Sequence, residues 1–295
     1  MSVNISSNAH TSTLVRVKEL ADNLSYLQSC VDGTEVEIQS VGFVTPLAIT
    51  ALAAEINRKS LIFKYGGTNS SYLRTINFPE GVSNVEASPS EGTYFPIIRL
   101  NMEGADKTSI ARLLSALHTK YLDLLKRNII ADERFMDLIT NNTFGFLLGE
   151  LFDNIEEHSE AKSAYLFTQY WQRMNSSEIC LLDDGQGLYG SLKKAGRDVH
   201  DDMDALRKVL EKGLSAKHEV GAAVRGTGIK NTRLAITNQE INGEFFIMSG
   251  SAAFLHSAKE GSKFITLTRA RLNGTMVMLR INEPRTKFNL YNYVR

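Results

Sequence analysis

Cysteine, proline and tryptophan are scarce in this sequence, and neither sign of charge is in excess. Its 295 residues include two cysteines, five prolines and one tryptophan. Cys30 and Cys180 stand far apart and fit no metal-ligand or redox spacing, so we expect two reduced core thiols in a cytoplasmic protein. Lys plus Arg and Asp plus Glu both count 33, which gives no electrostatic reason to expect a nucleic-acid or membrane partner.

The sequence also has no long apolar run, and its first residues do not have the pattern of a signal peptide. Residues 1–13 are polar and lack the basic and apolar regions of a secretion signal. The longest apolar-leaning run, 41–54, is too short to span a bilayer and contains Thr45, Pro46 and Thr50. The hydrophobic fraction of 43% is typical of a globular protein, and the length allows one large domain or two ordinary ones. We therefore expect a cytoplasmic protein.

The N-terminal part alternates between two kinds of pattern. Short strands are predicted at Leu14–Val17, Glu35–Ile38 and Leu61–Phe63, with helices at Val17–Cys30 and Leu47–Ile56. Strands alternating with helices indicate a layered α/β unit. The stretch 79–96 is rich in glycine, serine, asparagine and proline, which predicts a domain boundary.

The rest of the chain is first helical and then rich in strands. Apolar spacing predicts helices at 105–127, 132–139 and 141–158. Near the end, strands are predicted at Glu244–Met248, Ala252–His256, Phe264–Thr268 and Met276–Ile281. The predicted organisation is therefore an α/β domain at 1–95, a helical connector at 96–140 and a second domain at 141–295.

The helix at 144–158 carries the first candidate motif. With about 100° of rotation per residue, Glu150, Asn154 and Glu157 gather on one strip beside the apolar stripe. A carboxylate and a carboxamide four positions apart could hold a hard cation and orient water. A solvated face of an amphipathic helix would give the same pattern.

The second candidate motif follows a predicted strand at Ile179–Leu182. Asp183 and Asp184 end the strand, and Gly185 and Gly187 open a loop. Residues 185–190 match a dinucleotide fingerprint, but the aspartate pair would repel a pyrophosphate, and no long apolar helix follows. A Walker A loop would need Lys followed by Ser or Thr where this chain has Ser191-Leu192.

The third candidate motif places two glycines directly before a helix. Gly226 and Gly228 precede the apolar residues Ile229, Leu234 and Ile236. Free N–H groups and the dipole at a helix N-terminus suit a phosphate. Ordinary turn chemistry also places glycine before helices, so this motif alone leaves both interpretations open.

In this order, the three motifs resemble the signature of the GHKL ATPases, the family of histidine-kinase catalytic domains, gyrase B subunits and heat-shock chaperones. The signature is Glu-x-x-x-Asn on a helix, Asp-x-Gly-x-Gly after a strand and Gly-x-Gly-Ile before a helix, here within residues 141–284. Asn273-Gly274-Thr275 is similar to the family's late Gly-Thr. The resemblance implies an α/β fold of the α+β two-layer (Bergerat) type that binds ATP and magnesium.

The resemblance also implies a role for each matched residue. Glu150 would be the general base that orients the attacking water, and Asn154 the magnesium ligand. Asp183 would accept a hydrogen bond from the adenine amino group, with Thr275 supporting the adenine pocket. Four glycines would let the backbone approach the nucleotide and close over its phosphates beside a lid at 213–225: Gly185, Gly187, Gly226 and Gly228.

The chain departs from the family pattern at one phosphate contact. Histidine kinases often have a basic residue three positions after the helix asparagine, where this chain has Glu157. Lys217 and Arg225 are candidates to replace it, as is a lysine from another subunit. Glu150 itself favours hydrolysis, because pure kinases often lack that carboxylate.

The N-terminal stretch resembles a second family. Glu35–Arg58 is similar to the strand, loop and helix of STAS domains, the anti-sigma-antagonist fold, which implies a docking module over roughly residues 1–95. Such domains often carry an acceptor serine before the helix. Thr45 lies near that position but does not match it.

Three functions are compatible with these motifs. The first is a slow ATPase whose nucleotide state switches conformation or dimerisation and so engages a protein partner, which could be a second copy of the chain. The second is a protein kinase of the anti-sigma or sensor type; a phosphoacceptor role for His118 is disfavoured, because Thr119 stands where an acidic residue usually follows. The third is a module that holds ATP without turnover.

Overall fold

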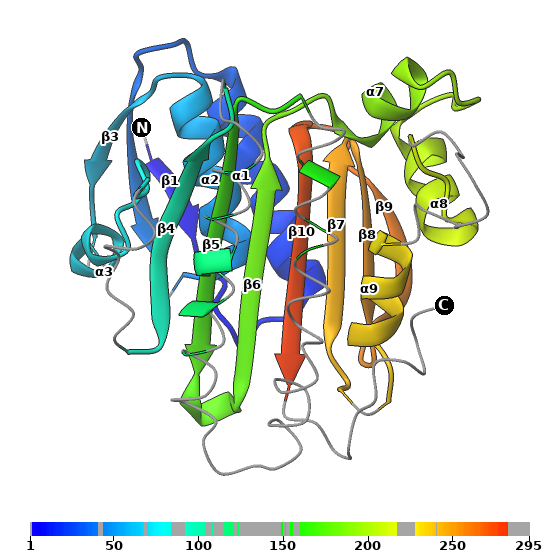
Figure 1. Cartoon of the computed structure of the whole chain (residues 1–295). Helices are drawn as coiled ribbons and strands as arrows, with labels where there is room; N and C mark the ends of the chain where they lie inside the picture. The colour runs from blue at the N-terminus through cyan, green and yellow to red at the C-terminus, as the bar shows by residue number, and fades with distance from the viewer. Residues whose placement is uncertain are drawn as a thin grey trace.

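The structure is a computed structural model and is a mixed α/β protein with two open sheets (Figure 1). It describes residues 2–40, 44–67, 70–83, 92–103, 160–216, 228–239 and 241–282, together with single positions within 108–123 and 149–155. In this part of the chain, no helix is both long and apolar enough to cross a bilayer. Cys30 and Cys180 are buried and form no disulfide, as expected for core thiols.

The N-terminal elements form a small parallel sheet in the order β1-β2-β3. The elements are β1 (Ser2–Ile5), α1 (Thr13–Ser29), β2 (Glu35–Ser40), α2 (Pro46–Arg58), β3 (Ile62–Tyr65) and α3 (Ser70–Thr75). The predicted strand at Leu14–Val17 is wrong, because these residues form the first turn of α1. Ser12 caps that turn by accepting a hydrogen bond from the Val15 N–H, and apolar residues at helical spacing continue it.

The large sheet has seven strands, and every neighbouring pair is antiparallel. Its order is β4-β5-β6-β10-β7-β8-β9, so the last strand lies near the middle. The strands are β4 (Tyr94–Asn101), β5 (Ser163–Trp171), β6 (Ser176–Asp183), β7 (Glu244–Gly250), β8 (Ala252–Ser257), β9 (Gly261–Thr266) and β10 (Leu272–Asn282). The four strands predicted near the end of the chain correspond to β7–β10.

The predicted boundary between residues 95 and 96 falls inside β4. Residues 96–101 therefore belong to the sheet and not to a helical connector, because this apolar stretch pairs with β5. A proline at position 96 is compatible with this strand, since β4 is the edge of the sheet and its pairing shifts register between Phe95 and Ile98.

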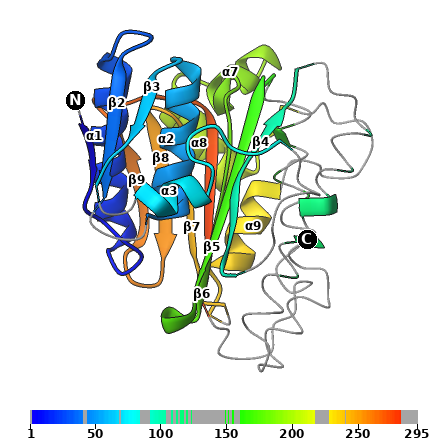
Figure 2. The same cartoon turned by 90° about the vertical axis from the view of Figure 1, so that its left-hand side faces the viewer.

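Two groups of helices cover the two faces of the large sheet. The helices α7 (Gly187–Lys194), α8 (Asp202–Lys212) and α9 (Gly228–Ile236) cover one face. On the other face α2 lies between the large and small sheets and packs against α1 (Figure 2). Side chains of β6 alternate accordingly, with Ile179 and Leu181 in one core and Cys180 and Leu182 in the other.

The second core joins the N-terminal elements to the large sheet. It contains buried residues of α1 and α2 together with residues of β5, β6, β7, β8 and β10. The predicted domain at 1–95 therefore shares its apolar core with the strands that follow.

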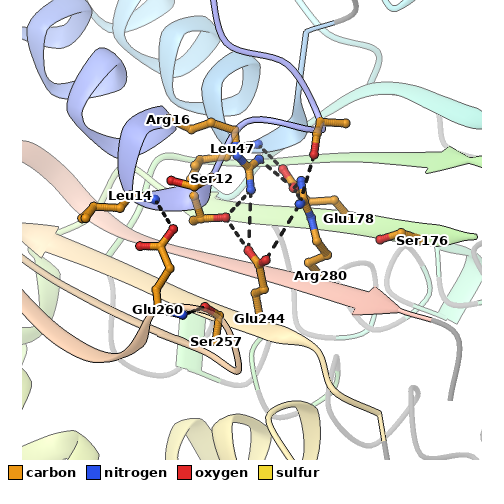
Figure 3. Close-up of polar contacts among 12 residues, drawn as sticks. Ser12, Leu14, Arg16, Leu47, Ser176, Glu178, Glu244, Ser257, Glu260 and Arg280 are labelled. Atoms are coloured by element: carbon orange, nitrogen blue, oxygen red, sulfur yellow. Dashed lines mark hydrogen bonds and ion pairs between the residues drawn. The ribbon is translucent and has the colours of Figure 1, made fainter. Parts of the chain in front are cut away.

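A buried ion cluster links the same parts of the chain (Figure 3). The Glu178 side chain on β6 is 0% exposed, and its carboxylate accepts hydrogen bonds from Arg16 Nη1 at 2.8 Å and Arg280 Nη2 at 2.9 Å. The Leu47 N–H at the start of α2 donates to the other carboxylate oxygen at 3.0 Å. Burial alone would raise the pKa of Glu178, but the charges of Arg16 and Arg280 and the Leu47 N–H lower it below its usual value.

We expect Glu178→Ala to lower the free energy of unfolding by roughly 3–5 kcal/mol, because two buried guanidinium groups would lose their closest counter-charge and keep only the longer ion pairs with Glu244, at 3.8 and 3.9 Å. Glu35→Ala is a matched control. Its ion pair with Lys64 is 2.6 Å long, but both side chains are more than half exposed, so the expected loss is about 1 kcal/mol or less. Urea unfolding measures both values. Equal losses in the two variants would show that the buried cluster does not hold the helices to the sheet.

Candidate functional site

One pocket lies between one face of the large sheet and the helices that cover it. Its walls are mostly apolar, and the described positions that line it include Leu151, Ile155, Leu181, Leu192, Val209 and Ile229. The polar residues among its lining are Asn154, Asp183, Ser191, Ser215 and Thr275. A flat apolar ligand with a few polar groups at its edge suits a pocket of this composition.

The pocket brings together residues from separate sequence motifs. Four of the predicted site residues line it directly: Asn154, Asp183, Gly187 and Thr275. Gly228 is the first residue of α9, next to Ile229 in the pocket wall. Gly185 contributes its N–H, which donates to Asp183 Oδ1 at 2.9 Å, as any residue but proline could.

Several predicted residues lie outside the described part of the chain. Glu150 and Gly226 are among them, and so are His118, Glu157, Lys217 and Arg225. Residues 214–216, at the start of the predicted lid, do line the pocket. Thr45 precedes α2 and is only 1% exposed, so its hydroxyl is not accessible to a modifying enzyme in this conformation.

Asp183 is the buried charge of the pocket. It ends β6, is 4% exposed and points to the same side of the sheet as Leu181. Burial raises the pKa of Asp183 to about 7, against the lowering effect of the Gly185 and Thr275 N–H groups. Because the pKa in the unfolded chain is about 4, ionising this carboxyl costs folding free energy, and the cost grows until the pH reaches about 7. A carboxylate held here at such a cost is a functional candidate.

The irregular pairing near the start of β10 requires a glycine beside Asp183. Gly274 has a φ of +92°, and a Cβ at this position would lie 1.8 Å from the Asp183 carbonyl oxygen. The pairing of β10 with β7 shifts register between Leu272 and Thr275, so Gly274 lies in this irregular part of the strand, next to the pocket residue Thr275. The backbones of Gly274 and Asp183 therefore approach each other more closely than a side chain at position 274 would allow.

Ser249 contacts two residues that line the pocket, Leu188 and Thr275, and the sequence motifs miss it. Its side chain is 2% exposed at the end of β7, and its hydroxyl accepts a hydrogen bond from the Leu188 N–H at 2.8 Å. A Cβ on Gly187 would lie 2.8 Å from this oxygen, so glycine is needed there as well. The only signal in the sequence is a single polar residue directly after the apolar run Phe245–Met248.

A second missed residue, Asp202, fixes the helix α8 whose Val209 lines the pocket. The Asp202 carboxylate receives two hydrogen bonds from Arg271, at 2.6 and 3.1 Å, and two from Ser251, at 2.8 and 2.9 Å. It is 7% exposed. This bidentate pair ties the start of α8 to the end of β7 and the turn before β10.

Neither a scan against protein-family models nor a search of the curated proteins finds a match to this chain. The functional proposal therefore depends on the geometry of the pocket and on the order of the motifs. The decisive features are a buried carboxylate, apolar walls and the start of α9, which all belong to one pocket.

We expect Gly274→Ala to lower the free energy of unfolding by roughly 3 kcal/mol or more, because positive φ strain adds to a backbone clash. Gly33→Ala is the control, since Gly33 also has a positive φ, +80°, but a Cβ there meets nothing within 4 Å. It should cost only about 1–2 kcal/mol. Thermal and urea unfolding give both values, and a Gly274→Ala variant no less stable than Gly33→Ala would contradict the close contact.

Proposed function

We propose that this protein binds magnesium ATP in the pocket beside Asp183, hydrolyses it slowly and uses the nucleotide state as a conformational or dimerisation switch. One observation carries the proposal: a buried carboxylate lines a mostly apolar pocket that is built from separate motifs. The proposed architecture of this part is the α+β two-layer sandwich of the GHKL type, supported by α7, α8 and α9 over one face of an antiparallel sheet.

The adenine ring fits the chemistry of the pocket. Apolar side chains from β6, α7, α8 and β10 would contact both ring faces, which removes apolar surface from water. The ionised Asp183 carboxylate can only accept hydrogen bonds, and the exocyclic amino group of adenine can only donate them there. A guanine would bring a carbonyl oxygen to the same place and would be repelled.

The phosphates and magnesium would lie between Asn154 and the start of α9. Helix N-terminal N–H groups favour anions, and the Asn154 amide oxygen is a suitable ligand for a hard cation. Within the described ranges, no three His, Cys, Asp or Glu side chains gather closely enough to hold a metal alone. A single protein ligand such as Asn154 is compatible with magnesium, because this ion is usually held by substrate phosphates and only one or two protein ligands.

The proposed switch would act through two parts of the chain, the predicted lid and the N-terminal elements. Leu214, Ser215 and Ala216 line the pocket at the start of the predicted lid, so bound phosphates would bias the position of that segment. The STAS-like N-terminal elements would supply a docking surface for a protein partner. A second copy of the chain is the first partner to test.

We expect the affinity for magnesium ATP to rise by up to about tenfold between pH 6 and pH 8, because the amino group needs the ionised form of a carboxyl with a pKa of about 7. Calorimetric titration at several pH values measures this. Asp183→Asn should bind at least tenfold more weakly and without the pH dependence. Binding in that variant equal to wild type would remove Asp183 from the adenine site, and no binding in wild type would refute the proposal.

Mutation of Glu150 distinguishes ATP hydrolysis from phosphate transfer to protein and from binding without turnover. Glu150→Ala should keep ATP binding and lose about a hundredfold or more of the hydrolysis rate, as for loss of a general base. Asn154→Ala should instead weaken the magnesium-dependent binding. Release of free phosphate supports the switch ATPase, whereas radioactive label transferred from γ-labelled ATP to protein would indicate a kinase. Unchanged phosphate release in Glu150→Ala would reject the assigned role.

A further inference from the structure

The Ser249 hydroxyl contacts three groups at the edge of the pocket. Besides the Leu188 N–H at 2.8 Å, it lies 3.1 Å from the Gly274 carbonyl oxygen and 3.3 Å from the Thr275 hydroxyl oxygen. Ser249 and Thr275 face each other across the β7 and β10 pair. Ser249 is 2% exposed, so protein groups must satisfy its hydrogen bonds.

The directions of these hydrogen bonds follow from counting protons. A hydroxyl has one proton to donate and two lone pairs to accept with. The Leu188 N–H can only donate, so it takes one lone pair of Ser249. The Gly274 carbonyl can only accept, so it takes the single proton. The remaining contact, with Thr275, is a hydrogen bond only when Thr275 donates its own proton to Ser249.

We infer that Ser249 is a positioning residue that makes Thr275 a hydrogen-bond acceptor toward the pocket, so that the site selects an amino group over a carbonyl on the purine. Asp183 and Thr275 both line the pocket and are paired across β6 and β10. With the Thr275 proton held by Ser249, both side chains present only lone pairs to a ligand. Two neighbouring acceptors match the amino group of adenine, or a water that it orients, and they repel the carbonyl of hypoxanthine or guanine.

The proton of Thr275 would be released if Ser249 could not accept it. The freed hydroxyl could then turn and donate to a carbonyl on the base, while Asp183 would remain unchanged. The loss of Ser249 should therefore reduce the discrimination between bases more than it reduces affinity for ATP. A purely structural loss would weaken both nucleotides together and leave their ratio unchanged.

The inference rests on the proposed ATP site and is tested by comparing ATP with inosine triphosphate, which carries a carbonyl at the same ring position. Calorimetry at pH 8, where Asp183 is mostly ionised, should show a clear preference for ATP in wild type. In Ser249→Ala the preference should fall by roughly fivefold to tenfold, the factor expected for one hydrogen bond. Ser262→Ala removes an exposed serine hydroxyl on β9 and should leave the ratio unchanged.

Repeating the Ser249 substitution in a Thr275→Val variant shows whether Ser249 acts through Thr275. In Thr275→Val, which has no hydroxyl proton, adding Ser249→Ala should not change the ratio further. Ser249→Cys keeps a side chain of similar size with a weak hydrogen-bonding thiol, and it should reproduce the effect if the alanine variant does not fold. An unchanged ratio in Ser249→Ala or Ser249→Cys, with ATP still bound, overturns this inference alone. Absence of ATP binding in wild type overturns the proposed function with it.

Discussion

The ion cluster around Glu178 is the constraint on which the arrangement of the chain depends. A carboxylate without access to water is tolerated because two guanidinium groups and the first N–H of α2 surround it. Arg16 comes from α1 and Arg280 from β10, so the N-terminal helices and the last strand must meet on β6 before the charge is compensated. The N-terminal helices thereby cover one face of the large sheet, and the pocket lies on the other face, beneath α7, α8 and α9.

Strands β6 and β10 carry the ion cluster on one side and line the pocket on the other. Glu178 and Arg280 face the N-terminal helices, whereas Asp183 and Thr275 face the pocket at the opposite end of the β6 and β10 pair. The two acids are in different electrostatic states, because guanidinium groups lower one pKa and burial raises the other. At neutral pH the ionised Glu178 therefore stabilises the fold, whereas ionising Asp183 destabilises it. Residues at functional sites often lower the stability of a protein in this way.

Local patterns in the sequence predict local features well. The α2 helix after Pro46 follows from nearby residues, since proline favours the first turn of a helix. The loop predicted after Asp183 is confirmed only up to Gln186, because Gly187 is the first residue of α7. Strand β4 was missed because it begins in a stretch rich in turn formers, where only pairing with β5 makes it extended. The ion cluster and Ser249 were also missed. Arg16 is 162 positions from Glu178, and Thr275 is 26 from Ser249, distances that no local pattern spans.

The central place of β10 has a consequence for how the protein is made. Strands β6 and β7 do not touch each other until β10 enters between them, yet β10 is the last strand of the sheet to leave the ribosome. Nearly the whole described chain must therefore be synthesised before the pocket can exist, and earlier nascent chains expose two unpaired sheet edges. Because pairing between distant parts of a chain slows folding, these edges stay unpaired until β10 joins the sheet.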